Sequence, residues 1–133
     1  MKFGVGIVPY NLGETAVSAK LAEDQGFDYI GIPDSQSLWR ELYLSLSIVA
    51  NATKKVCLGP MVTNPLTRHP AVSASAIATL NEISHGRAFL GIGSGDSAIL
   101  NLGLRPAKMG DTREYLSLIH ISEPTRPRLI SNA

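Results

Sequence analysis

Short, continuously apolar runs alternate along the chain with longer segments in which apolar residues recur every three or four positions. The four runs are residues 2–9, 28–34, 56–65 and 87–95. They are rich in Val, Ile and Gly and are bounded by Pro, Asn and Gly, a pattern typical of buried strands. The sequence therefore predicts four strands, each fully covered rather than half exposed.

The three intervening segments have the periodicity of amphipathic helices and carry end signals. They cover 13–27, 40–55 and 69–87. Gly26 and Gly86 are placed to end the first and third helices, and Pro70 suits the first position of the third. The residues expected to face the core are Val17 and Leu21 in the first segment, Leu42, Leu46 and Val49 in the second, and Ala74, Ile77, Leu80 and Ile83 in the third.

This alternation of strand and helix predicts an α/β fold with a parallel sheet covered by helices. Two architectures fit the pattern, an open doubly wound sheet and a (β/α) barrel. Both bind ligands beyond the carboxyl ends of the strands, so chemistry is expected from residues that follow each strand. Those residues are Asn11, Asp34, Thr63, Asn64, Ser94 and Asp96.

The glycine-rich stretch "FLGIGSGDSA" (89–98) decides between the two architectures. A dinucleotide fold needs Gly-x-Gly-x-x-Gly after its first strand. Here Gly91, Gly93 and Gly95 follow the fourth strand, and Asp96 stands where the third glycine is required. No Gly-Lys-Ser/Thr phosphate loop occurs either. The spacing excludes a dinucleotide fingerprint and favours the rim of a barrel.

Composition narrows the class of protein further. The chain has 133 residues, 44% apolar and 17% charged, with a formal net charge of +1, so a nucleic-acid or anionic-membrane partner is not indicated. Cys57 is the single cysteine and is expected to be a buried thiol, and no cluster has metal-ligand spacing. Because no run reaches the length of a membrane span and the start lacks a cleavage site, we expect a cytoplasmic protein.

The stretches "TNPLTRHPA", "LNEISHGR", "LGIGSGDSA" and "NLGLRP" together resemble the luciferase-like monooxygenase superfamily, in its F420-dependent branch of methylenetetrahydromethanopterin reductase-like proteins. The resemblance covers about residues 2–115. It implies the N-terminal half of a (β/α)8 TIM barrel, about four β-α units, truncated. It also implies an oxidoreductase that transfers hydride between F420 and a small organic substrate, or alternatively an FMN-dependent monooxygenase that uses O2. A third alternative is a non-catalytic half-barrel that self-associates.

The resemblance also carries cofactor contacts onto this sequence. Members of the family back the coenzyme ring with a bulge in the third strand that contains a non-proline cis peptide, and the matching positions are Met61 and Val62. A Gly-Pro kink is the plainer interpretation of the same stretch. The remaining cofactor-binding residues implied are Thr63, Asn64, Gly93, Ser94, Gly95 and Ser97. Asn64, before Pro65, is equally typical of a turn.

Two carboxylates are the catalytic candidates, Asp34 and Asp96. Each follows a strand and could orient substrate or relay a proton, although each is also placed to cap a helix. Arg68 could meet an anionic group or act structurally. One departure from the family stands out, because its reductases carry an acidic residue in the first strand where this chain has Gly6.

The C-terminal stretch "SLIHISEPTRPRLISNA" does not continue the pattern. We therefore expect two parts, residues 1–116 as the half-barrel and residues 117–133 as a non-homologous tail, read through from a vector or disordered. Half a barrel leaves two strand edges unpaired, so the chain alone is expected to self-associate or be inactive. The full-length parent is expected to be a homo-oligomer.

Overall fold

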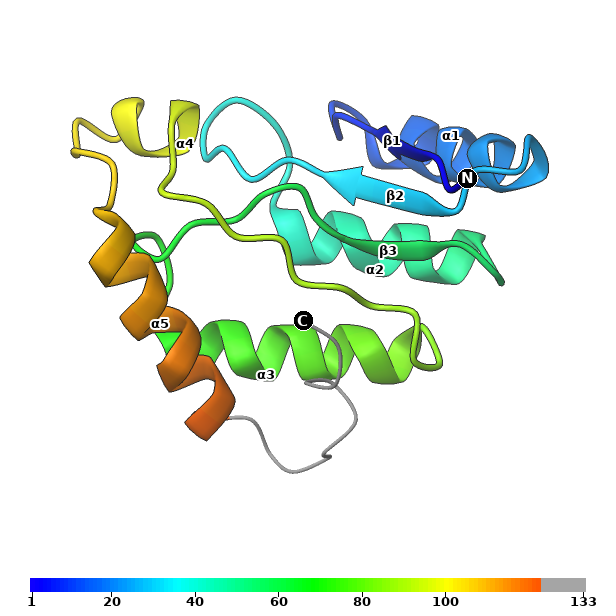
Figure 1. Cartoon of the computed structure of the whole chain (residues 1–133). Coiled ribbons are helices and arrows are strands. Elements are labelled where there is room, and N and C mark those ends of the chain that lie inside the picture. The colour runs from blue at the N-terminus through cyan, green and yellow to red at the C-terminus, as the bar shows by residue number, and fades with distance from the viewer. Residues whose placement is uncertain (123–133) are drawn as a thin grey trace.

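The computed structural model describes residues 1–122 and shows four successive units in which an extended segment is followed by a helix (Figure 1). The elements are β1 (Gly4–Gly6), α1 (Leu12–Asp24), β2 (Tyr29–Ile32), α2 (Leu42–Ala52), β3 (Cys57–Pro60), α3 (Pro70–Ile83), α4 (Ser97–Leu100) and α5 (Met109–Ser122). The strands form a parallel sheet in the order β1-β2-β3. Along the chain, α1 packs against α2, α2 packs against α3, and α3 packs against α5. The predicted α/β fold, in which helices follow the strands of a parallel sheet, is confirmed.

The fourth predicted strand, 87–95, is not a continuous strand. It touches β3 and its extension through two isolated parallel bridges, Leu58 with Ala88 and Thr63 with Ile92. Five residue steps separate Leu58 from Thr63, whereas four separate Ala88 from Ile92. One extra residue on the β3 side is a bulge, and it interrupts the ladder between the two bridges. The prediction of a regular strand was wrong for this reason, although the segment does occupy the fourth position.

The main core lies between the sheet and helices α1 to α3. Its largest buried side chains come from the strands and from the predicted face of α2: Ile30, Ile32, Leu42, Leu46, Val49 and Leu58. The prediction for α2 is confirmed, and in α3 Ala74, Ile77 and Leu80 are buried while Ile83 is exposed. Cys57 is half-buried rather than buried.

Helix α1 turns a different face inward from the one its large residues suggested. Val17 and Leu21 are 70% and 58% exposed, whereas Ala19 and Ala22 are buried. Small side chains let α1 pack closely against α2, and this packing replaces the larger contact expected from the i, i+4 pair. The prediction that Val17 and Leu21 face the core was wrong.

Helix α5 packs across α3 and crosses the expected boundary at residue 116. Tyr115 and Ile119 are buried with Ala74 in a second apolar cluster. The Tyr115 hydroxyl lies 2.6 Å from Ser73 Oγ and donates to the Arg68 carbonyl at 2.9 Å. The helix therefore includes residues 117–122 of the expected tail, and residues 123–133 lie outside the described part of the chain.

The loop that leads into β3 is held by a single carboxylate. Glu23, near the end of α1, accepts hydrogen bonds from the backbone N–H groups of Lys54, Lys55 and Val56 at 2.7–3.0 Å. Burial acts to raise the pKa of Glu23, but these three donors, with Lys20 nearby, lower it below its usual value. The ionised form is therefore the one that the fold stabilises.

Stability should depend on pH through Glu23. Because its pKa is lower in the folded chain, its contribution is present above the unfolded pKa, near 4.3, and is lost as pH falls through the folded value. We expect Glu23→Gln to be less stable than the parent by about 1 kcal/mol at neutral pH, since the site is close to solvent. The difference should vanish in acid, as measured by urea unfolding. Asp24→Asn, which removes only a contact with the exposed Lys20, should show no such dependence.

Candidate active site at the strand ends

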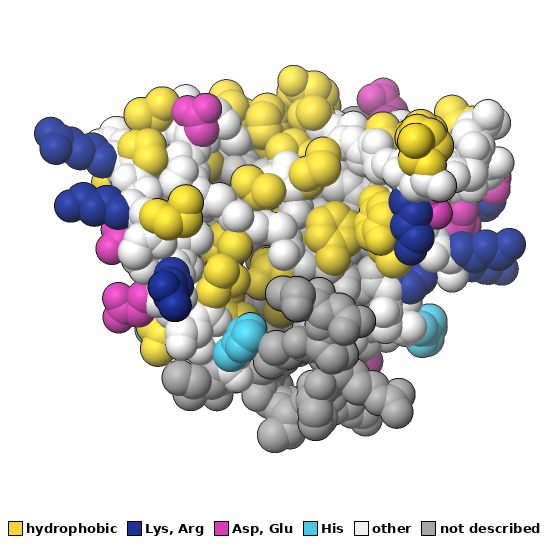
Figure 2. All heavy atoms as spheres, viewed as in Figure 1, with side chains coloured by type: hydrophobic (Ala, Val, Ile, Leu, Met, Phe, Trp, Pro, Cys, Tyr) yellow, Lys and Arg dark blue, Asp and Glu magenta, His cyan; other side chains and the backbone are white. Residues whose placement is uncertain are grey.

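Polar and glycine residues from three elements meet beyond the carboxyl ends of β2, β3 and the 87–95 segment. Figure 2 shows apolar side chains gathered over the open face of the sheet that faces the viewer. Met61 and Val62 are both about half exposed, and the Met61 side chain lies against Gly6 and Gly31 of the sheet. The site is therefore a rim around an apolar floor, which suits a flat aromatic ligand.

The floor is built around the cis peptide bond between Met61 and Val62, neither of which is proline. Its occurrence at these positions confirms the bulge expected in the third strand. The Met61 side chain lies over two glycines of the neighbouring strands. A Cβ added to Gly31 would lie 2.4 Å from Met61 Cβ, and one added to Gly6 would lie 2.9 Å from Met61 Cε. Both positions therefore need glycine while Met61 occupies this space.

Val62 lies against the fourth segment, where glycines again make room. A Cβ on Gly93 would lie 3.1 Å from Val62 Cγ2, and one on Gly91 would lie 2.4 Å from the Pro60 carbonyl oxygen. The backbones of β3 and the fourth segment thus approach one another directly. The Thr63 N–H donates to the Gly91 carbonyl and the Gly93 N–H donates to the Thr63 carbonyl, at 3.0 and 2.9 Å. The glycine-rich stretch forms the rim that its spacing predicted.

Asp34 is buried and fully engaged by its neighbours. Its carboxylate accepts from Thr63 Oγ1 at 2.7 Å, from Gln36 Nε2 at 2.8 Å and from both terminal nitrogens of Arg68, the shorter at 2.6 Å. Arg68 also pairs with Glu41, which is more exposed, at 2.6 Å. Asp34 does not cap a helix in this structure. It ties the end of β2 to the bulge in β3.

Arg68 is the centre of this network. Burial acts to lower the pKa of its guanidinium, but Asp34 and then Glu41 raise it above the usual value, so the ion pair stays charged. The guanidinium carbon lies 5.2 Å from the centre of the Tyr43 ring, a cation–π arrangement. Burial in turn raises the pKa of Tyr43 to about 12. The sequence left two roles open for Arg68, contact with an anionic group or a structural role. Its ion pairs with Asp34 and Glu41 correspond to the structural role.

Asn64 combines a turn with a free donor. Its Oδ1 accepts from the backbone N–H groups of Leu66 and Thr67, both at 3.0 Å, which is the turn expected before Pro65. Its side chain is 1% exposed, and its Nδ2 has no hydrogen-bond partner among the described residues. Gly95 lies beside it, since a Cβ there would be 3.2 Å from Asn64 Cβ. A buried donor without a partner is costly, and a water or a ligand acceptor beside it would satisfy it.

The loop after the fourth segment presents the other predicted residues. Asp96 precedes α4 but makes no capping hydrogen bond, and it is exposed. Ser97 Oγ lies 2.7 Å from Ser35 Oγ, which joins this loop to the one after β2. Gly95 has a φ of +84°, which favours glycine. The Ser94 carbonyl accepts from the Ala107 N–H at 2.8 Å.

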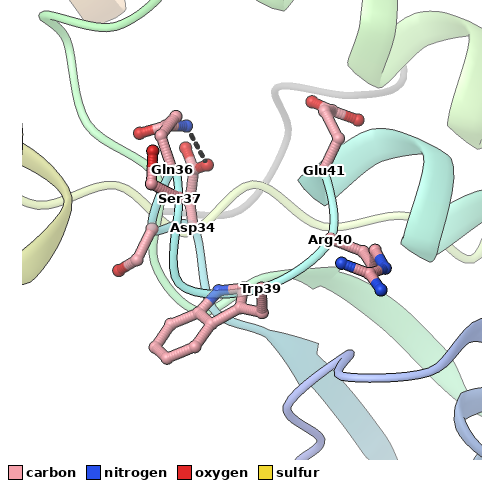
Figure 3. Close-up of a pocket in the computed structure, with 7 residues that line it drawn as sticks. Asp34, Gln36, Ser37, Trp39, Arg40 and Glu41 are labelled. Carbon is pink, nitrogen blue, oxygen red and sulfur yellow. Dashed lines mark hydrogen bonds between the residues drawn. The ribbon is translucent and has the colours of Figure 1, made fainter.

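A small cavity of about 150 Å³ opens in the loop after β2, lined by residues 34–37 and 39–41. In Figure 3 the Gln36 and Asp34 side chains lie against each other and Glu41 stands across from them. Trp39 donates from Nε1 to the Pro33 carbonyl at 3.0 Å. Gln36 and Glu41 were not among the predicted site residues, because no local sequence signal marks a residue that contacts Asp34 or Arg68.

Two negative findings apply to the described residues, 1–122. No helix there has the length and apolar character to cross a membrane. No group of three or more His, Cys, Asp or Glu side chains there is arranged to hold a metal ion.

Comparisons with known proteins agree with this geometry. The sequence model of the luciferase-like monooxygenase family matches residues 1–122. This chain belongs to that family. It is 53% identical over 97 residues to a 5,10-methylenetetrahydromethanopterin reductase of Archaeoglobus fulgidus, covering 72% of this chain and 29% of that protein. The chain thus spans less than a third of that relative's length.

Solved structures of the family extend the same likeness. The coenzyme F420-dependent tetrahydromethanopterin reductase of Methanopyrus kandleri superposes with a TM-score of 0.82 at 34% identity, over 90% of this chain and 39% of that one. The oxygenating component of 3,6-diketocamphane monooxygenase of Pseudomonas putida, in complex with FMN, gives 0.73 at 28% identity with the same coverage. The fold is therefore that of part of a luciferase-like TIM barrel.

Proposed function

We propose that this chain carries the coenzyme-binding rim of an F420-dependent oxidoreductase that acts on a small organic substrate. The observation that carries the proposal is the Met61–Val62 bulge, which lies uncovered at the strand ends between two glycine positions. The likeness to the coenzyme F420-dependent tetrahydromethanopterin reductase of Methanopyrus kandleri supports F420 as the coenzyme. Because the chain spans only part of such enzymes, turnover is proposed for a whole barrel that contains this segment.

The residues present fit a flat coenzyme with a polar edge. The exposed Met61–Val62 segment offers a wall for one ring face, and Gly93 leaves space over Val62. Asn64 Nδ2 is a buried donor with no partner among the described residues. The proposed cofactor contacts from the loop are the Ser94 and Ser97 hydroxyls and the backbone of Gly95, which is set by its positive φ.

F420, when bound, would supply the carbon that accepts or donates a hydride. The chain's own groups would position it and control protons. Asp34, held by Arg68, would orient Thr63 rather than exchange protons itself, because all its near neighbours are donors. Asp96, exposed and free of a capping bond, is the carboxylate left to hold or pass a proton. Gly6 stands in β1 where the reductases of the family carry an acidic residue. No side chain at that position could supply a proton here, so the proton would come from another group.

FMN with O2 is the second candidate. The FMN-bound monooxygenase of Pseudomonas putida shares this part of the fold at 28% identity. The same uncovered wall at Met61–Val62 would back either ring. The choice of F420 rests on the higher identity with the F420-dependent reductase, 34% against 28% for the FMN-bound monooxygenase.

Titration of the chain with F420 and with FMN, followed by coenzyme fluorescence, tests the proposal. We expect saturable binding of F420 and at least about tenfold weaker binding of FMN. Gly93→Leu should abolish binding by filling the rim, whereas Gly110→Leu, in an open position of α5, should not. Tighter binding of FMN would favour the monooxygenase. Binding of neither, or binding unaffected by Gly93→Leu, would overturn the assignment of this rim.

A further inference from the structure

Arg68 is held through both its backbone and its side chain by groups from distant parts of the chain. Its backbone carbonyl accepts a hydrogen bond from the Tyr115 hydroxyl of α5 at 2.9 Å. Its guanidinium donates to the Asp34 carboxylate, beyond the end of β2, at 2.6 Å. Helix α3 does not use the Arg68 carbonyl, because its hydrogen bonds begin at the carbonyl of its N-cap, His69. Arg68 therefore connects α5 to the strand ends.

The Tyr115 hydroxyl has a second contact, with the first turn of α3. It lies 2.6 Å from Ser73 Oγ, and both side chains are buried. A phenol has one hydrogen, so a Tyr115 that donates to Arg68 accepts from Ser73. Burial raises the pKa of Tyr115, which keeps that hydrogen in place at neutral pH. In Figure 1, α5 crosses the N-terminal end of α3, where these groups meet.

The Arg68 guanidinium continues this contact to the rim. The Asp34 oxygen that accepts from Arg68, Oδ2, also accepts from Thr63 Oγ1 at 2.7 Å. Thr63 directly follows the cis peptide bond of the bulge, and its side chain is buried. Its backbone N–H and carbonyl make two of the hydrogen bonds that hold the fourth segment against the bulge. An unbroken series of contacts of 2.6–2.9 Å therefore runs from Tyr115 through Arg68 and Asp34 to Thr63.

We propose that Tyr115 is a positioning residue for the coenzyme rim. Its ring packs in the apolar cluster between α3 and α5, so it acts through Arg68 and does not touch a ligand at the strand ends. By fixing the Arg68 backbone it sets where the guanidinium meets Asp34, and with it the position of Thr63 and the bulge. The effect on coenzyme binding rests on the proposed function, whereas the effect on the rim itself does not.

Three variants separate the hydroxyl from the packing. Tyr115→Phe keeps the buried ring and removes only the donor to the Arg68 carbonyl. Ile119→Val is the matched control, because it removes one methylene from the same buried cluster and leaves both hydroxyls in place. Ser73→Ala removes the donor to Tyr115 but keeps the bond to Arg68, so it should produce a smaller change of the same kind as Tyr115→Phe.

Amide hydrogen exchange of the full chain without coenzyme is the first readout. In Tyr115→Phe we expect at least about fivefold faster exchange at the Thr63 and Gly93 N–H groups, and less than about twofold at Val56, which precedes β3. Ile119→Val should show no such preference for the rim. Equal acceleration at all three amides would indicate a loss of stability alone, and no acceleration at Thr63 would show that the contact does not reach the rim. Either result would overturn the proposal.

Titration with F420, followed by its fluorescence, is the second readout. We expect about tenfold weaker binding for Tyr115→Phe than for the parent, and less than about twofold for Ile119→Val. In a Thr63→Val background, which removes the hydroxyl at the end of the series, Tyr115→Phe should weaken binding by less than about twofold more.

The outcomes distinguish the positioning role from the proposed function. A tenfold loss that persists in the Thr63→Val background, or a Tyr115→Phe chain with the affinity of the parent, would overturn the positioning role. A parent chain that binds no coenzyme would instead remove the proposed function. The exchange rates at Thr63 and Gly93 would then decide the role of Tyr115 on their own.

Discussion

Replacing Arg68 by methionine is expected to lower the free energy of unfolding by about 3–5 kcal/mol. The Asp34 side chain is 2% exposed, and Arg68 is its only cationic partner in the described network. Removal of the guanidinium leaves a buried carboxylate without an opposite charge, the most destabilising way to break an ion pair. Chemical denaturation monitored by Trp39 fluorescence measures the loss.

The two carboxylates that share Arg68 provide the control. Glu41→Gln keeps the acceptor that caps α2 and removes a charge that is 43% exposed, so it should cost less than about 1 kcal/mol. Adding Asp34→Asn to Arg68→Met should recover part of the lost stability, because the uncompensated charge is gone. An Arg68→Met chain within about 1 kcal/mol of the parent, or a double variant less stable than the single one, would contradict this account.

Most of the fold could be predicted because each unit carries its own local signals. Pro70 begins α3, Gly26 follows α1 with a φ of +85°, and Leu42, Leu46 and Val49 bury the face of α2 as their spacing indicates. Such signals act over one or two helical turns. Their effect on local structure therefore does not depend on how distant parts of the chain pack.

The errors occurred where packing between distant segments decides. Val17 and Leu21 form the better apolar stripe, yet α1 buries Ala19 and Ala22 because the small residues permit a closer approach. The 87–95 segment has the composition of a strand, but a residue inserted on the β3 side breaks its pairing. Neither outcome can be predicted from a short window of sequence, because each depends on contacts between distant segments.

The candidate site divides in the same way. Thr63, Asn64 and the glycines were placed at the rim because parallel strands end together, and the cis bond at Met61–Val62 was expected from the family resemblance. The ion pair between Asp34 and Arg68 joins residues 34 positions apart, and only the fold brings them together. Asp34 was thus a candidate by position, and its neighbours now argue for an orienting role.

Arg87 anchors the start of the fourth segment, and its removal is the second change expected to have a large effect. Its guanidinium donates to the carbonyls of Ala50, Thr53, Val56 and Ser84 at 2.8–3.1 Å and to Thr53 Oγ1 at 2.9 Å. Arg87→Met removes this donor from acceptors at the end of α2, at the C-cap of α3 and just before β3. We expect a loss of about 2–4 kcal/mol in the free energy of unfolding.

The pattern of losses identifies the cause. The free energy of unfolding of Arg87→Lys should lie between those of the parent and Arg87→Met, because one lysine ammonium cannot donate to all of these carbonyls at once. Arg113→Met, at an exposed arginine of α5 that makes no side-chain hydrogen bond or ion pair within residues 1–122, should cost less than about 0.5 kcal/mol. Since only two bridges hold the 87–95 segment to β3, Arg87→Met should also speed amide hydrogen exchange at Phe89 and Gly93. Unchanged exchange there would show that the bulge at Met61 and Val62 alone fixes the rim.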